Sequence, residues 1–238
     1  MTEDKKMAEK ELFKVINLEQ DEFAQIHSFN AADESHKFHI IVDGTNYNLM
    51  YRDGQFLGMP QRFGGTIYPF SKNPTKQGSF FQKRKFTNAR IVVLSRGNKL
   101  LVEWGTGRPY MIEDPVTHDP YTVGAGGKFY VNIIPNNNGE TANKFYLGVL
   151  SQGRCADQDS ICAYLKPAFE TAFGAKIQEY IQQENKSLEN YVGLQPKELL
   201  TISRELFPRM KYVFEKFGLE LVDESDEALL SQLVVNPA

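Results

Sequence analysis

The hydrophobic residues of this 238-residue chain change their period once, and that change limits the folds open to it. Up to about residue 135, short apolar runs are separated by glycine, proline and asparagine, a pattern typical of β-strands. From Asp157 onward, apolar residues recur every three or four positions, which predicts helices over Asp157–Glu184 and Pro196–Phe217. Leu219–Val222, directly after Gly218, is typical of one more strand. Strands first, helices second and a strand last predict an α+β fold with mainly antiparallel strands.

The β-rich half contains one pair of runs that we expect to form a hairpin. Asn88–Ser95 and Lys99–Trp104 are apolar-rich and are joined by Arg96-Gly97-Asn98, which favours a turn. Asp53-Gly54 predicts another tight turn. Gly124–Gly127 does not match a phosphate-binding loop, because neither Gly-Lys-Ser/Thr nor a helix pattern follows it. We interpret these glycines as a turn or bulge that lets strands approach closely.

The two ends of the chain are expected to contribute little to the folded core. Residues 1–37 are polar, and we expect a loosely attached extension in which Met7–Phe23 forms a short helix. Residues 224–238 form an acidic tail with a brief apolar patch at Leu229–Val235.

The composition favours a soluble protein of the cytoplasm. The longest unbroken aliphatic run, Ile91–Leu94, is far shorter than the roughly 20 residues that span a bilayer. An apolar segment typical of a secretion signal is not found after the polar N-terminus. Cys155 and Cys162 are too few for a disulfide framework, which fits a reducing compartment.

Charge is distributed unevenly along the chain. The formal net charge is −3, yet residues 61–100 contain only basic charged side chains. Displayed together, these side chains would form a positive face suited to anionic lipid, nucleic acid or an acidic surface on another copy. The alternative is that they only balance the acidic helices of the same fold. The residues for which we predict contact with an anionic surface or a partner are Arg62, Lys72, Lys76, Lys83, Arg84, Lys85 and Arg90.

One basic cluster also carries aromatic neighbours. Lys83-Arg84-Lys85 lies close to Phe80, Phe81 and Phe86, which combines charges for phosphates with rings for stacking. Three basic residues are a minimal patch, however, and two phenylalanines before a strand more often anchor a core. Nucleic-acid binding through the basic 62–99 block is therefore the alternative function.

Residues with catalytic or metal-binding chemistry are few. Cys155 and Cys162 are seven positions apart, unlike the C-x₂-C pairs of zinc sites. Asp114, His118 and Asp119 share one proline-bounded loop and offer an acid and a base, but a nucleophile in a recognisable setting is not found with them. A hydrolase that uses this loop is kept as a rival hypothesis. We predict neither catalytic, cofactor-binding nor metal-binding residues.

The second predicted helix carries an apolar seam with spacings close to those of a coiled coil. Pro208 lies within it and predicts a kink. Such a seam usually packs on the sheet of its own chain, and self-association is the alternative. The seam consists of Leu199, Ile202, Leu206, Met210, Val213 and Phe217.

A series of short motifs runs in order through residues 38–223. They are Ile41–Asn46, Tyr51–Gln55, Phe63–Tyr68, Leu101–Thr106 with Pro109 and Asp114-Pro115, Gly127–Ile133, and Phe214–Leu221. In order and spacing they resemble the SPFH (band 7) superfamily of stomatins, prohibitins and flotillins, and most closely its bacterial virion-core-like branch. The stretch from Trp104 to Asp114-Pro115 is the most specific part, since it is similar to that branch's W-G-T-x-x-P…D-P signature.

The resemblance implies an SPFH domain in two parts, a β-rich subdomain at 38–135 and an α-rich subdomain at 141–223. It implies a non-enzymatic scaffold that forms homo-oligomers and organises membrane-proximal protein partners, in a membrane-stress response, without a cofactor or a small-molecule substrate. The membrane hairpin or acylated N-terminus, the long coiled coil and the zinc ribbon of many relatives are not recognised in this sequence. Membrane contact is therefore expected to be peripheral, at the inner face of the membrane, or through a partner.

Overall fold

The computed structural model describes residues 13–16, 18, 22–30, 37–40, 45–59, 66–67, 88–151, 157–222 and 229–238. It confirms an α+β fold in which antiparallel strand pairs predominate. Contacts within the chain divide it into two compact units, Met1–Asn98 with Ile133–Asp157 and Lys99–Asn132 with Gln158–Ala238. Each unit combines two separate stretches of sequence, so its limits do not coincide with the ranges 38–135 and 141–223 implied by the SPFH resemblance.

The first unit contains two sheets. In the smaller sheet, β1 (Phe13–Ile16) runs parallel to β3 (Lys37–Ile40), which pairs antiparallel with β6 (Thr66–Ile67). The larger sheet is antiparallel, with the order β2-β7-β4-β5. Its strands are β2 (Ala24–Asn30), β7 (Asn88–Ser95), β4 (Asn46–Arg52) and β5 (Gln55–Gly58).

The tight turn predicted at Asp53-Gly54 is confirmed. It joins β4 to β5, and both residues have positive φ angles, 46° at Asp53 and 81° at Gly54. Two successive left-handed residues match the twist of a two-residue hairpin, and aspartate followed by glycine adopts that conformation at low cost.

The central position of β7 overturns the predicted hairpin between Asn88–Ser95 and Lys99–Trp104. Both edges of β7 are occupied, by β2 and by β4. Ile91–Leu94 is fully buried, as expected for an unbroken apolar run in a strand that is covered on both faces. β8 (Leu100–Gly105) instead pairs with β10 (Pro120–Ile133) in another sheet. The two runs are strands, but they do not form a hairpin.

A short helix packs against the larger sheet. α2 (Glu140–Phe145) continues directly as the π-helical turn η2 (Tyr146–Leu150). Phe145 meets Phe23 edge to face, with ring centroids 5.6 Å apart. The sequence pattern predicts no helix before Asp157, because a π-helical turn interrupts the 3.6-residue period on which that prediction depends.

The N-terminal prediction is wrong for the described residues. Phe13–Ile16, expected within a helix over Met7–Phe23, is strand β1, whereas residues 7–12 lie outside the described part of the chain. Within the supposed loose extension, β2 pairs with β7 from Ala24↔Leu94 to Asn30↔Asn88. A short apolar run is ambiguous between helix and strand, and pairing with strands distant in sequence decides the outcome here.

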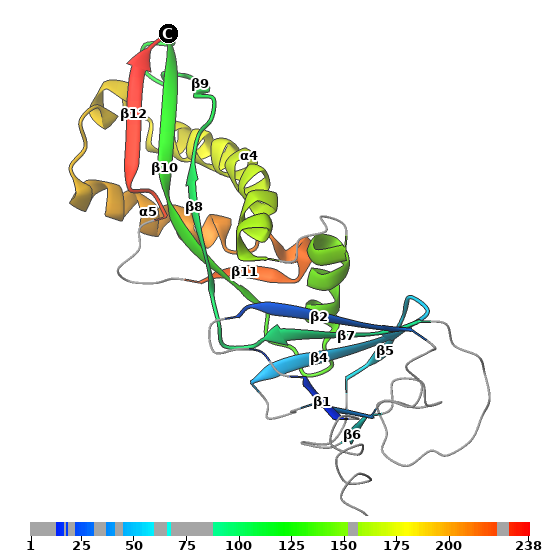
Figure 1. Ribbon diagram of the computed structural model, residues 1–238. Helices are drawn as coiled ribbons and strands as arrows, with labels where there is room; N and C mark the ends of the chain where they lie inside the picture. Colours follow the sequence, from blue (N-terminus) through cyan, green and yellow to red (C-terminus); the bar gives the residue numbers. More distant parts are fainter. Residues whose placement is uncertain are drawn as a thin grey trace, which may run out of the picture. The chain divides into compact units, whose positions relative to one another are not determined.

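β10 is the spine of the five-stranded sheet in the second unit. It is 14 residues long and pairs with β8, β9 (Tyr110–Glu113), β11 (Leu219–Val222) and β12 (Gln232–Pro237). Figure 1 shows β9 and β12 on opposite sides of β10. Residues 229–238 of the predicted tail are therefore part of the fold, because Leu233 and Val235 bury their side chains and their strand belongs to the sheet. Residues 224–228 lie outside the described part of the chain.

Gly124–Gly127 lies inside β10, so the predicted turn or bulge is wrong. Pairing continues through these residues, with Gly126 opposite both Gly105 and Gln232. The closeness of the strands explains the small residue: a Cβ added at Gly126 would lie 3.3 Å from the carbonyl oxygen of Trp104. Glycine is therefore required by packing between strands rather than by a reversal of the chain.

Aromatic side chains fill the core between this sheet and α4 (Gln158–Glu184). The Trp104 ring packs on Phe169 and Phe173, with centroid distances of 4.9 and 4.5 Å. Phe129 stacks on Phe169 at 4.2 Å, and Phe214 lies 5.7 Å from Phe129. The indole Nε1 of Trp104 donates to the carbonyl oxygen of Leu229 at 3.0 Å, so its one polar atom is also satisfied.

The second long helix is shorter than the spacing predicts. After the 3-10 turn η3 (Leu188–Tyr191), α5 (Pro196–Met210) begins with a capping box formed by Gln195 and Glu198. It ends two residues after Pro208 instead of at Phe217, and the 3-10 turn η4 (Glu215–Phe217) follows. A proline this close to the end removes one helical hydrogen bond, and the changed path turns Phe214 fully into the core.

Candidate functional site

The loop between β9 and β10 holds the three residues that offer an acid and a base in the sequence. The strands pair from Tyr110↔Val123 to Glu113↔Pro120, which places Asp114, His118 and Asp119 in the turn. Within the loop, the Asp114 amide donates to the Asp119 carbonyl at 2.9 Å, and the His118 amide donates to the Asp114 carbonyl at 3.0 Å. These two backbone hydrogen bonds close the turn at its base.

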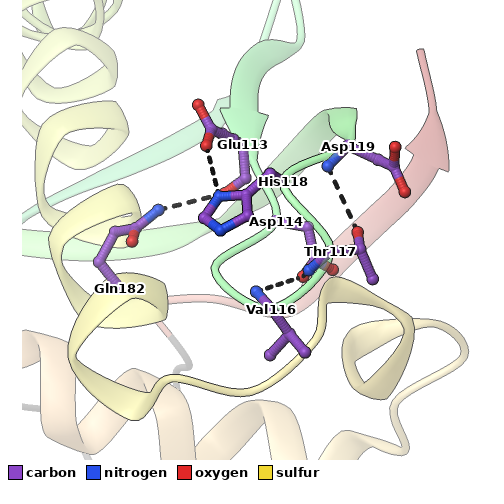
Figure 2. A network of polar contacts seen from close by, with 7 residues as sticks. All are labelled: Glu113, Asp114, Val116, Thr117, His118, Asp119 and Gln182. Atoms are coloured by element: carbon purple, nitrogen blue, oxygen red, sulfur yellow. Dashed lines mark hydrogen bonds and ion pairs between the residues drawn. The ribbon is translucent and has the colours of Figure 1, made fainter.

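The Asp114 carboxylate is fully buried and accepts hydrogen bonds at both oxygens. Oδ1 accepts from the amides of Val116 at 2.7 Å and Thr117 at 2.9 Å, as Figure 2 shows. Oδ2 accepts from the Ser187 hydroxyl at 2.9 Å and from the Leu188 amide at 2.6 Å. One side chain thus holds its own turn and ties it to the start of η3.

These bonds decide the charge of Asp114. Burial by itself would raise the pKa of the carboxyl group. Hydrogen bonds from the amides of Thr117, Leu188 and Val116 and from the Ser187 hydroxyl outweigh burial and lower the pKa to about 2. Asp114 is therefore an ionised structural acceptor, and its lone pairs are already engaged by groups that cannot leave without opening the loop.

His118 lies on the other side of the same turn. Its side chain is 75% exposed, and its Nδ1 lies 2.9 Å from Glu113 Oε1. Its φ angle of 64° is left-handed, an uncommon conformation for a residue other than glycine. In Figure 2 the side chains of Asp114 and His118 make separate contacts: the His118 ring lies against Glu113, whose carbonyl accepts from Gln182 at 3.1 Å.

This geometry does not join the side chains of Asp114, His118 and Asp119 into an acid–base pair, and the carboxylate beside His118 is that of Glu113. The Asp114 carboxylate is directed to backbone amides instead, and Asp119 contributes its own amide to Thr117 Oγ1 at 3.3 Å. Within the described part of the chain, a group of three or more His, Cys, Asp or Glu side chains able to hold a metal ion is not found. The loop can stabilise the fold, and the hydrolase hypothesis gains no support from it.

Of the predicted basic contacts, Arg90 falls within the described residues. The other six, Arg62, Lys72, Lys76, Lys83, Arg84 and Lys85, lie outside them. The Arg90 guanidinium donates to the Tyr146 hydroxyl and lies 5.9 Å from the centroid of that ring. Arg90 is therefore exposed and also links strand β7 to η2.

Arg90 belongs to a polar cluster that the sequence does not reveal. Tyr51 lies opposite Arg90 in the β4–β7 register, its ring is 4.7 Å from that of Tyr146, and its hydroxyl donates to Asn143 Oδ1. Burial, followed by the neighbouring Tyr146, raises the pKa of Tyr51, and Arg90 opposes them. The strand alternation indicates that Tyr51 points to one face, but α2, which supplies Asn143, gives no helical period in the sequence.

The predicted apolar seam lies within the second unit. Leu199, Ile202, Leu206 and Met210 are buried on α5, which packs against α4 and β12. Val213 and Phe217 follow the end of the helix and are half-buried. A role of these residues in self-association remains a prediction.

None of the helices in the described part of the chain combines the length and the apolar character needed to cross a bilayer. Comparison of the chain with protein-family models and with curated proteins gave no match.

Proposed function

We propose that this chain is a non-enzymatic SPFH-domain scaffold that self-associates and organises membrane-proximal protein partners. The ordered motifs that resemble the SPFH superfamily support it, and an α+β fold is compatible with it. The proposal extends to contact with an anionic membrane surface through the basic residues between Arg62 and Arg90.

The observation that carries the proposal is the way in which Asp114 uses its carboxylate. The most specific motif of the resemblance runs from Trp104 to Asp114-Pro115. Both carboxylate oxygens of Asp114 accept hydrogen bonds from donors in the loop and at η3. The Trp104 ring packs on α4, and its N–H donates to the Leu229 carbonyl. A catalytic motif keeps polar atoms available to a substrate. In this motif the polar atoms of Asp114 and Trp104 are instead hydrogen-bonded within the fold. Such use supports a structural protein.

The sheet of the second unit also suits a scaffold. Its 14-residue spine, β10, receives strands along both edges, and the aromatic core fixes it to α4. A strand anchored along its whole length moves little, so surfaces built on it keep their geometry when partners bind.

Light scattering with anionic and with neutral vesicles tests the proposal. We expect the pure protein to scatter as more than a monomer, and anionic vesicles to bind it more strongly than neutral ones. A variant with Lys83→Ala, Arg84→Ala and Lys85→Ala should lose most of that difference, because each basic residue near an anionic surface contributes to binding. A strict monomer that ignores both kinds of vesicle would overturn the proposal. A salt-dependent shift with DNA or RNA instead would favour the nucleic-acid alternative.

A further inference from the structure

β12 is bonded to the sheet along one edge. It pairs with β10 from Tyr121↔Pro237 to Gly126↔Gln232. The second edge of β12 pairs with none of the described strands, although η3 and α5 contact β12. In Figure 1 it lies beside β10 on the side away from β8 and β9. An edge strand presents backbone N–H and C=O groups that can pair with another chain.

The register shows which backbone groups face that second edge. The Ala238 amide donates to the Pro120 carbonyl at 3.0 Å, and the two residues continue the β12–β10 register. In an antiparallel ladder, hydrogen-bonded and non-hydrogen-bonded pairs alternate. Val234 is therefore bonded to Gly124, whereas Leu233 and Val235 turn their backbone groups away from β10. The Val234 side chain is 44% exposed, on the face opposite to the buried Leu233 and Val235.

This edge lacks the features that usually prevent pairing. The edge strand β5 is short, its pairing with β4 shifts register between Met50 and Tyr51, and it ends at Gly58 with φ 102°. β12 has the sequence Gln-Leu-Val-Val-Asn-Pro, with no charged residue, and Pro237 stands only at its end. Charges, bulges and short length are the devices by which edge strands avoid one another, and the centre of β12 has none of them.

We propose that β12 pairs antiparallel with β12 of a second copy, about a two-fold axis that passes between the two Val234 residues. This inference deepens the self-association proposed above and rests on it. Leu233 of each copy lies opposite Val235 of the other as a hydrogen-bonded pair, and the two Val234 side chains face each other on the exposed side. The two sheets then form one continuous sheet.

A second copy is the occupant that the strand itself favours. The two-fold axis places β12 of one copy beside β12 of the other. Because β12 has no charged residue, no like charges face each other in this pairing. Valine also suits a paired strand, because its β-branched side chain packs well on a pleated surface. Because the pairing is short and standard stable interfaces bury about 1,600 Å², it predicts a weak dimer that depends on concentration.

Cross-linking tests the register. In a Cys155→Ser/Cys162→Ser background, Val234→Cys should form an intermolecular disulfide, since Cα atoms of a non-hydrogen-bonded pair lie about 4.5 Å apart, within the range of disulfides. Asn236→Cys is the matched control: it is exposed on the same face, but the register separates it from its counterpart by roughly 13 Å. Several-fold more dimer from Val234→Cys supports the proposal. Equal yields from both variants, or no dimer from either, overturn it.

Charge repulsion tests the interface independently. Val234→Lys should raise the dimer dissociation constant at least about tenfold and leave the thermal midpoint unchanged, because the two lysines would lie directly opposite each other. Met111→Lys, at a 66% exposed position on β9, should leave dimerisation unchanged. If the wild type dimerises and Val234→Lys dimerises equally, the β12 interface is wrong while self-association stands. If the wild type does not self-associate, both proposals fail.

Discussion

The sheet of the second unit is used differently at its inner face and at its outer edge. On the inner face, Trp104 and Phe129 are buried against α4, and Trp104 belongs to the motif that resembles the SPFH superfamily. At the outer edge, Val234 is exposed on a strand with no charge and lies outside every motif. The motif residues therefore stabilise this fold, while the association that we propose depends on residues that no motif identifies.

The largest expected effect comes from the inner face. Trp104→Ala removes a ring packed on Phe169 and Phe173 together with the hydrogen bond to Leu229, and should destabilise the protein by about 4 kcal/mol, or about 12 °C. Circular dichroism measures the midpoint, since Trp104 is the sole tryptophan and fluorescence is lost with it. Met111→Ala, on an exposed side chain, is the control and should change the midpoint by about 1 °C at most. If Trp104→Ala lowers the thermal midpoint only slightly, the inner face does not stabilise the fold more than the outer edge does.

Asp114→Ala should rank second, with a loss of roughly 8 °C, because four donors lose a buried charged acceptor at once. Differential scanning calorimetry measures it. If Asp114→Ala melts like the wild type, the carboxylate does not hold the turn to η3, and the structural role that we assign to it is wrong.

The pH dependence of stability tests the same carboxylate. Its pKa is lowered in the folded chain from 3.8 to about 2, so the unfolded chain takes up the proton first as the pH falls. The stabilisation is therefore complete above about pH 4 and is lost between about pH 4 and 2. We expect the difference in thermal midpoint between the wild type and Asp114→Asn to narrow over that interval. A difference that stays constant down to pH 2 would contradict an ionised Asp114.

Gly174→Ala should have an intermediate effect of about 2 kcal/mol, or about 5 °C. A Cβ at this position would lie 2.4 Å from Tyr110 Cε1, and that ring is held by the hydrogen bond from Tyr110 to the Glu170 carbonyl at 2.7 Å. Urea unfolding measures the effect. The same substitution in a Tyr110→Leu background is the control and should cost less, since the ring that obstructs the methyl group is gone. Equal costs in the two backgrounds would show that Tyr110 is not the obstacle.

The smallest expected effect lies on the exposed side of the β9–β10 loop. His118→Ala should change the midpoint by about 1 °C at most, because its contact with Glu113 joins two side chains that are 75% and 64% exposed. Thermal unfolding of this variant beside Asp114→Ala compares the two sides of one turn. A loss as large as that of Asp114→Ala would mean that the exposed pair supports the loop.

Local patterns predicted the elements of this fold better than their partners. The α+β class, the turn at Asp53-Gly54 and the helix over Asp157–Glu184 follow from composition and period, which are properties of neighbouring residues. The partners of Asn88–Ser95 were predicted wrongly, because strand pairing depends on residues far away in sequence. The helix at Glu140 was missed because its π-helical turn breaks the period.

The candidate site was predictable only in part. Asp114, His118 and Asp119 were predicted as a candidate site because they share one loop. The sequence could not show that Asp114 accepts hydrogen bonds from Ser187 and Leu188, more than seventy positions away. That contact decides between a catalytic acid and a structural acceptor. The edge at β12 was missed for a related reason: six uncharged residues at the end of a chain resemble a tail until their pairing with β10 is known.

Sedimentation velocity of the full chain over a concentration series tests the central claim of a self-associating scaffold most directly. We expect a weight-average mass that rises above the 27.1 kDa of one chain as the concentration increases from about 1 µM to about 500 µM. We also expect the mass to return to that of one chain on dilution, since the proposed contact is weak. A mass of 27.1 kDa at every concentration would contradict the account.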